Sequence, residues 1–469
     1  MSDKLITLDG MSASFEEYHR LQSSKRYGVQ FPSGGSNSGT RLWDAVDMTS
    51  TPTFGSTAGS SDFDDAEPFK HRRCNVKNGE VVSYKGYPDF DENGGNGDVY
   101  EEFNNVYLYI SEDENTFGVS MRQWDDDWFP AVLVNGEMPS KIYIPAYKMT
   151  KDSSGKGRSI AGGQPYWDSF SGHLNAAKLN GDMYHTGPSW YDAWKQVMLA
   201  VEYASRDAQN GSQMQGFSGG LYSQTGCQVS NDAVNTNIIP VNNPQNLVVG
   251  QTVRICTGWI SQDKTDDRHI TNIDSSGKTI TIDGDPVTVE NGWTVYNMDW
   301  KTGSTLSVTG DTGQAVKSNK YPMKWRGIED IWGGSAEDIC DLRIMPTGGA
   351  TDPWEFYYCP DPRIVGTADN PNDNYINTGI TMPSSEGYAK SFQAPDDYPN
   401  VRLIRESGAS STTYYADYFW RSTTATTARS VRSGGYWNGG ALLGVSCRYC
   451  YSAASASDRY YCARLFFTR

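Results

Sequence analysis

Long helical patterns are scarce in this chain, whereas short runs of β-branched and aromatic residues recur along it between glycine- and aspartate-rich turns. Val106–Ile110 and Lys141–Tyr147 are two such runs, and side chains of these types favour a pleated, half-buried surface. Glycine supplies 48 of the 469 residues, as expected of a chain that turns often. With 37% hydrophobic residues the chain can build sizeable cores, so we predict a β- and loop-rich protein of two to four domains.

Two segments nevertheless carry helical spacing. The first covers about 170–180. The second begins at Ser189, which we predict as the N-cap, and has its apolar residues three or four positions apart. They are Trp190, Trp194, Val197, Met198 and Val201. These side chains would form an apolar stripe about one face wide, which predicts an ordinary core helix.

Composition divides the chain into four parts. Residues 1–70 are polar and rich in glycine and serine, notably over 31–39, which predicts an N-terminal arm or attachment region that pairs with another chain. Residues 71–235 and 321–469 read as two parts of one domain. Between them, 236–320 contain short strands at regular spacing, broken by glycine and aspartate, which predicts an inserted β-sandwich or β-barrel module.

Net charge, hydropathy and cysteine usage limit the partners and the compartment that we expect for the protein. The net charge of −16 repels the nucleic-acid backbone, and the basic cluster Lys70–Arg73 is too short to offset it, so we expect no nucleic-acid partner. The first residues lack the apolar region of a signal peptide, and no run approaches the roughly 18 apolar residues of a membrane span, so we expect no membrane insertion. The eight cysteines are mostly isolated, which favours synthesis in a reducing cytoplasm.

The closing segment, 433–461, has the most informative composition. It holds five tyrosines among serine, glycine and alanine, and it contains no lysine and no glutamate. Tyrosine offers a large, rigid contact area at low entropic cost, and serine and glycine offer adaptable polar contacts, as in binding loops that must suit many targets. The alternative is a glycine-rich β-edge with scattered exposed tyrosines.

Metal and redox chemistry leave only weak signals. Asp89–Gly94 begins like a calcium loop, but Tyr100 stands where a bidentate glutamate is expected, so we interpret Asp89–Asp98 as a solvated acidic turn and leave calcium open. Cys447 and Cys450 form a CxxC, which can act as a redox pair or hold a soft metal. The five histidines lack ligand spacing and the common catalytic motifs are absent, so we predict no catalytic residue, no metal and no cofactor.

Several segments, taken in order, resemble motifs of the C-type lectin fold of formylglycine-generating enzymes. They are Trp190–Trp194 with Val201–Ala204, Arg326–Gly333, and Arg432–Trp437 with Cys462–Leu465. The similarity covers roughly 80–235 and 321–469. It implies an α+β fold of the C-type lectin (formylglycine-generating-enzyme-like) kind, with an inserted small β domain and an N-terminal arm. The chain departs from the enzymes at Ala336–Asp338, where both tryptophans of their Trp-Glu-Trp element are missing.

Within this fold the chain resembles the variable proteins of diversity-generating retroelements, which include phage tail-tip proteins of the major tropism determinant type. In that family a C-terminal segment is rewritten at template adenines, chiefly in asparagine codons, and the altered side chains bind a host-surface ligand. The tract 436–461 lies at the matching position, just before the last strand. The resemblance implies that the variable, ligand-binding positions are Tyr436, Leu442, Tyr449, Cys450, Tyr451, Ser452, Asp458, Arg459, Tyr460 and Tyr461.

The resemblance also implies a place of action. We expect a receptor-binding protein of a phage tail fibre or baseplate, located at the virion tail tip and made in the bacterial host cytoplasm. Its expected partners are a host-cell-surface protein or glycan, other tail proteins and further copies of itself in a homotrimer, where multivalency would raise avidity on the order of 100-fold or more.

Two alternatives stay open beside this adhesive, non-enzymatic function. One is a copper-dependent oxidase like the formylglycine-generating enzymes, acting on a cysteine-containing peptide. The sequence around Cys447 and Cys450 resembles the cysteine region of these enzymes, although the enzymes' two cysteines are more widely spaced. The other alternative is a structural baseplate protein without a ligand.

Overall fold

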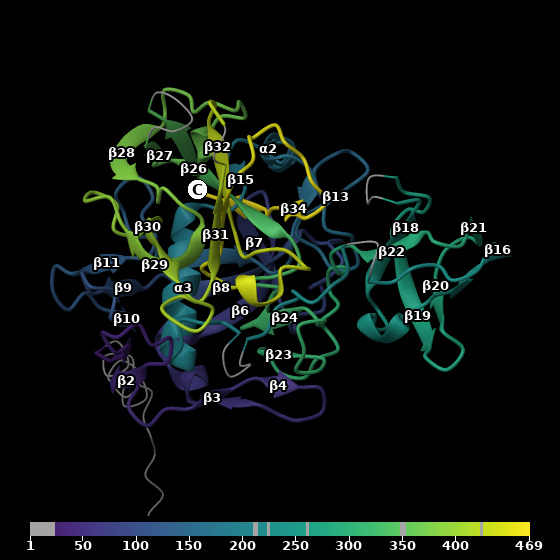
Figure 1. Cartoon of the computed structure of the whole chain (residues 1–469). Helices are drawn as coiled ribbons and strands as arrows, with labels where there is room; N and C mark the ends of the chain where they lie inside the picture. The colour runs from purple at the N-terminus through teal and green to yellow at the C-terminus, as the bar shows by residue number, and fades with distance from the viewer. Residues whose placement is uncertain (1–23, 210–213, 223–225, 259–261, 348–352, 423–424) are drawn as a thin grey trace, which may run out of the picture.

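The computed structural model describes residues 24–209, 214–222, 226–258, 262–347, 353–422 and 425–469 (Figure 1). In these residues the protein is mostly β-sheet and has two α-helices, α2 (Phe170–Lys178) and α3 (Ser189–Tyr203). The predicted β-rich character is confirmed, and the chain is more strongly β than an α+β class implies. Neither helix in the described ranges is long and apolar enough to cross a membrane.

Two antiparallel sheets come from the N-terminal half. The first has the order β11 (Trp128–Pro130), β9 (Tyr107–Ile110), β10 (Thr116–Ser120), β1 (Arg26–Gln30) and β2 (Thr40–Trp43). The second has the order β12 (Lys141–Pro145), β8 (Asp98–Asn104), β6 (His71–Lys77) and β7 (Glu80–Tyr84). Both sheets turn one apolar face toward a shared core.

The predicted arm is wrong for residues 24–70. β1 pairs with β10 along its whole length, and Tyr27, Val29 and Phe31 alternate into the main core. Phe63 and Phe69 are buried beside them. Glycine and serine between these positions form the turns, so a polar average composition concealed a core-building pattern of period two. Residues 1–23 lie outside the described residues.

The largest sheet has nine strands and contains the closing segment. Its order is β28 (Ile376–Thr381), β27 (Trp354–Tyr358), β26 (Ala336–Pro346), β32 (Arg429–Ser433), β33 (Arg448–Cys450), β31 (Tyr418–Arg421), β29 (Gly387–Gln393) and β30 (Leu403–Ala409), with β34 (Tyr461–Cys462) beside β26. The sheet curls into a half barrel, and its end strands β28 and β30 contact each other. Because β33 lies between β32 and β31, part of the closing segment is an interior strand.

Four small sheets of short strands complete the main body, and two of them join the two halves of the chain. They are β4 (Thr53–Phe54), β23 (Gly313–Gln314), β24 (Met323–Trp325) and β25 (Ile328–Glu329) in one sheet, β15 (Tyr184–His185) with β35 (Phe466–Phe467), β13 (Thr150–Lys151) with β14 (Gly157–Arg158), and β3 (Ser50–Thr51) with β5 (Ser60–Ser61). The first two of these sheets pair strands from distant parts of the sequence: β4 pairs with β23, and β15 pairs with β35 near the C-terminus.

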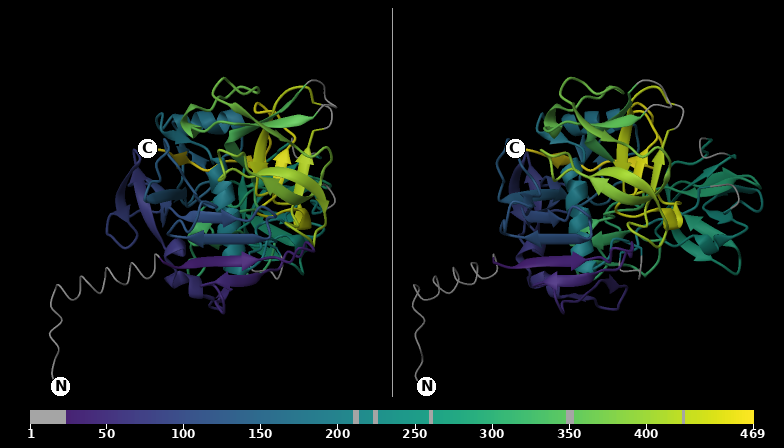
Figure 2. Two further views of the ribbon diagram at one scale, coloured as in Figure 1. Left: turned by 90° about the vertical axis from the view of Figure 1, so that its left-hand side faces the viewer. Right: turned by 60° about the vertical axis from the view of Figure 1, so that its left-hand side comes forward.

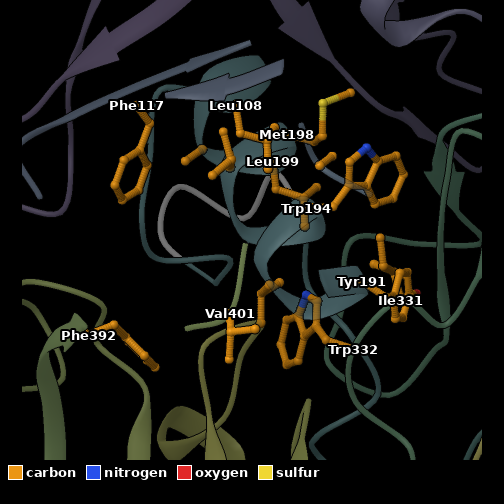
Figure 3. Close-up of a cluster of buried hydrophobic side chains, with 14 of the residues drawn as sticks. Leu108, Phe117, Tyr191, Trp194, Met198, Leu199, Ile331, Trp332, Phe392 and Val401 are labelled. Carbon is orange, nitrogen blue, oxygen red and sulfur yellow. The ribbon is translucent and has the colours of Figure 1, made fainter. Parts of the chain in front are cut away.

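Helix α3 occupies the centre of the molecule, between the N-terminal sheets and the nine-stranded sheet (Figure 2). Its residues Trp194, Met198 and Leu199 lie with Leu108 and Phe117 on one side, and with side chains of the C-terminal half on the other (Figure 3). Thirteen of its 15 residues are buried, so the predicted one-face stripe was too narrow.

The predicted N-cap of α3 is also wrong. Pro188 occupies that position, and Ser189 is the first helical residue. The backbone N–H and the hydroxyl of Ser189 both donate to the carboxylate of Asp341, at 2.9 Å each. A carboxylate from β26 therefore replaces the local cap, which no local sequence pattern reveals.

A small β module projects from the main body, at the right of Figure 1. Its sheet has the order β17 (Ile238–Pro240), β20 (Thr279–Ile282), β19 (Arg268–Asp274), β18 (Thr252–Cys256) and β22 (Thr294–Asn297), and β16 (Ala233–Thr236) pairs with β21 (Val287–Val289). It has its own apolar cluster, which begins at Leu221. Because Leu221, Cys227 and Val229 belong to this cluster, the module begins before 236, and because β23 pairs with β4 of the main body, it ends before 320.

Candidate functional site

Strand alternation decides which side chains of the closing segment reach the surface. In β33, Tyr449 is half-buried, whereas its neighbours Arg448 and Cys450 are buried. In β31, Tyr418 and Trp420 are half-buried, whereas Phe419 and Arg421 are buried. Trp420 stands opposite Tyr449 in the parallel pairing of these strands, so the rings share the outer face of the sheet.

The rings on this outer face form one contiguous cluster. Trp420 contacts Tyr436 and Tyr449, with ring centroids 5.6 and 6.2 Å apart. Tyr460 contacts Tyr436 at 5.1 Å and Tyr449 at 6.4 Å. Further contacts extend the cluster at its edges, through Tyr388, Tyr418, Tyr451 and Tyr222. We call the eight residues the aromatic face: Tyr222, Tyr388, Tyr418, Trp420, Tyr436, Tyr449, Tyr451 and Tyr460.

The ten predicted positions do not behave alike. Tyr451 is 51% exposed, and seven others are half-buried: Tyr436, Leu442, Tyr449, Ser452, Asp458, Arg459 and Tyr460. Cys450 and Tyr461 are buried, at 0% and 2% exposure, so their prediction as surface positions is wrong. Cys450 points inward because it neighbours Tyr449 in a strand, and Tyr461 lies in β34, whose two residues are both buried.

Four members of the aromatic face were not predicted. Tyr388, Tyr418 and Trp420 lie on β29 and β31, and Tyr222 lies at the edge of the inserted module. Tyr418 and Trp420 do carry a signal, because aromatic residues two positions apart mark one face of a strand. Tyr388 pairs directly with Tyr418, which only the sheet register reveals.

A buried charged layer supports the aromatic face from below. The guanidinium of Arg432 lies 3.6 Å from the ring centroid of Tyr461, and its Nε is 2.7 Å from a carboxylate oxygen of Asp338. His173 holds the other oxygen of Asp338 at 2.5 Å. Within the described ranges, Nη1 and Nη2 of Arg432 have no hydrogen-bond partner, so the Tyr461 ring is a main contact of this cation. Tyr461 is thus a structural residue.

Three phenols of this region are held in the neutral form. Burial raises the pKa of Tyr436, Tyr460 and Tyr461 above the ordinary value near 10. The hydroxyl of Tyr461 is 2.7 Å from that of Ser452. Tyr436 and Tyr460 therefore offer the aromatic face apolar rings with neutral hydroxyls, which suits contact with an uncharged or weakly polar surface.

The CxxC is poorly placed for redox or metal chemistry. Cys447 and Cys450 are both buried and are not joined to each other. Burial raises the pKa of Cys450 to about 12, and that of Cys447 well above its usual range. Because the thiolate is the reactive and metal-binding form, these thiols are held in the unreactive state. Across the part of the chain that the structure describes, no group of three or more His, Cys, Asp or Glu is placed to hold a metal.

The acidic turn uses its carboxylates locally. Asp91 accepts the backbone N–H groups of Asn93 and Gly95, both at 2.8 Å, and Asp89 accepts the hydroxyl of Ser83 at 2.7 Å. The basic cluster is likewise engaged within the protein, since Arg73 pairs with Glu101 at 2.5 Å and with Glu92 at 2.9 Å. Neither segment contributes to the aromatic face.

No protein-family model matches the chain, and no curated protein sequence matches it.

Proposed function

We propose that the protein is a receptor-binding protein of a phage tail tip, and that the aromatic face binds a molecule of the host-cell surface. The observation that carries this proposal is the contiguity of eight partly exposed aromatic rings, which lie on and beside the outer face of the nine-stranded sheet. A continuous aromatic patch on the surface of a soluble protein marks an interaction site. Tyrosine and tryptophan are also the residues that dominate binding energy at interfaces.

Buried residues in and beside the closing segment hold its backbone, and their neighbours carry side chains of the aromatic face, which supports a diversified surface. In the motif that resembles the C-type lectin signature, Arg432 and Trp437 are fully buried, and Gly434 and Gly435 have φ near +80°. These residues hold the backbone, and side chains between and after them, such as Tyr436 and Tyr449, point outward. We therefore propose the C-type lectin fold of retroelement variable proteins for the main body.

The proposed variable positions are those with partly exposed side chains: Tyr436, Leu442, Tyr449, Tyr451, Ser452, Asp458, Arg459 and Tyr460. The ligand is a protein or glycan of the host surface, and the protein acts as a homotrimer with other tail proteins. Residues Tyr388, Tyr418 and Trp420 lie outside the closing segment, and they supply a constant aromatic base beside the variable rings.

Adsorption of the labelled protein to a panel of bacterial strains, measured by flow cytometry, tests the proposal. We expect saturable binding to at least one strain. Tyr449→Ala and Trp420→Ala should each weaken it about tenfold or more, which corresponds to about 1.4 kcal/mol per factor of ten. Tyr87→Ala is the matched control, because Tyr87 is 56% exposed and lies outside the aromatic face.

Equal binding by all three variants would contradict the proposed face. Absence of saturable binding to any strain would favour a structural baseplate protein. Near-ultraviolet circular dichroism of each variant verifies that the fold is retained.

A further inference from the structure

The inserted module meets the main body beside the aromatic face. Its strands β18 and β22 contribute Cys256 and Tyr296 to an apolar cluster that also contains Trp437. Tyr460 and Tyr222 pack against the same cluster, and their ring centroids are 6.0 Å apart. The closing segment therefore touches the module as well as the sheet that carries the aromatic face.

A chain of ion pairs crosses this junction. Arg459 binds the carboxylate of Asp263 and the hydroxyl of Tyr296 through Nη1. The same carboxylate oxygen of Asp263 is 2.7 Å from Arg254, whose Nε is 2.6 Å from Asp267. Arg459 comes from the main body, and the other four residues of this network, namely Asp263, Tyr296, Arg254 and Asp267, belong to the module. The side chains of the two ion pairs at Asp263 are only 14–17% exposed, so solvent screens them less than it screens a surface pair.

A tryptophan of the main body completes the junction. The guanidinium carbons of Arg459 and Arg254 lie 5.5 and 5.9 Å from the ring centroid of Trp167. The fork of Arg459 thus contacts a carboxylate, a phenol and a ring at once, which a shorter or uncharged side chain cannot do.

We propose that Arg459 is a positioning residue, which holds the inserted module as a side wall of the aromatic face. A change at position 459 then moves the wall in addition to altering one surface contact. The consequence of this role for ligand binding rests on the proposed function, in which residue 459 is one of the variable positions. Diversification of this single position would reshape the site beyond the reach of its own side chain.

Distance measurement by pulsed electron paramagnetic resonance tests the proposal without a ligand. Spin labels are placed at Ser276→Cys in the module and Ser411→Cys in the main body, both exposed, whereas all eight native cysteines are buried. We expect one narrow distance distribution with Arg459 present, a shifted or broadened one in Arg459→Ala, and partial recovery in Arg459→Lys. The control Arg363→Ala removes an arginine that pairs with Asp361 at 2.8 Å in a turn of the main body, and it should leave the distribution unchanged.

Nitration by tetranitromethane, read by mass spectrometry, gives a second measurement. We expect Tyr460 and Tyr222 to react several-fold faster in Arg459→Ala, and Tyr87 to react at an unchanged rate. An unchanged distance distribution together with unchanged nitration of Tyr460 and Tyr222 would overturn the proposal. Neither measurement needs host cells, so failure of the receptor-binding proposal would leave both results interpretable.

Discussion

Replacing Tyr461 by alanine should destabilise the protein far more than replacing Tyr451, although both tyrosines belong to the same closing segment. Tyr461 is 2% exposed and covers the guanidinium of Arg432, whereas Tyr451 is 51% exposed. Comparing the two alanine variants therefore tests whether buried tyrosines such as Tyr461 support the fold while exposed ones such as Tyr451 can be replaced without loss of stability.

The expected magnitudes follow from the contacts. Truncation of a fully buried large aromatic side chain costs about 3–5 kcal/mol, and loss of a desolvated cation–π contact adds about 2 kcal/mol, so Tyr461→Ala should cost about 5–7 kcal/mol. Tyr461→Phe keeps the ring and loses the 2.7 Å contact with the Ser452 hydroxyl, a loss of about 1 kcal/mol. Tyr451→Ala should change the free energy of unfolding by about 0.5 kcal/mol or less.

Thermal unfolding followed by near-ultraviolet circular dichroism provides the assay. With an unfolding entropy of about 2.1 cal/mol/K per residue, the Tm of a 469-residue chain shifts by about 1 °C per kcal/mol. Tyr461→Ala should therefore lower the Tm by about 5–7 °C, and Tyr451→Ala by about 0.5 °C or less. Failure of Tyr461→Ala to fold, with Tyr461→Phe folded and only slightly destabilised, would agree with the reasoning. If both alanine variants melted within about 2 °C of each other, the assignment of Tyr461 to the supporting layer would be refuted.

The remaining predictions concern buried ionisable groups. Burial raises the pKa of Asp341 to about 7, above the unfolded value of about 3.9, so the unfolded chain loses this proton first and stability should fall as pH rises from about 4 to 7. Asp341→Asn should remove this loss, so its stability relative to the unsubstituted protein should be about 3 kcal/mol more favourable at pH 8 than at pH 5, and its relative Tm correspondingly higher. An equal difference at both pH values would contradict this prediction. All eight cysteines are buried and unbridged, so Ellman's reagent should report no fast-reacting thiol in the native protein and eight after denaturation. A fast-reacting thiol at Cys447 or Cys450 in the folded protein would reopen the redox alternative.

Local patterns predicted the helices well and their surroundings poorly. The spacing of apolar residues placed the start of α3 to within one residue, because helical periodicity is a property of neighbouring residues. The burial of Asp192 and Glu202 on the same helix was not predicted, since it depends on Arg448 of β33 and on Arg326 in the turn between β24 and β25. The carboxylate of Asp341 at the helix start is a similar case.

The same division holds for the candidate site. The composition of the closing segment pointed to Tyr436, Tyr449, Tyr451 and Tyr460, which do lie on the aromatic face. It also pointed to Tyr461, because composition carries no information about the side of a strand on which a residue lies. A shift of one residue moves every side chain to the opposite face of a sheet.

The amino-acid sequence by itself determined that the protein is rich in β-strands, that one central helix begins near Ser189, and that tyrosine is concentrated close to the C-terminus. Each of these features follows from the properties of adjacent residues. Only the tertiary structure decided which tyrosines face solvent, which ring covers Arg432, and which acid of the inserted module holds Arg459. These outcomes depend on strand register and on pairings between residues far apart in the chain, and local sequence does not specify them.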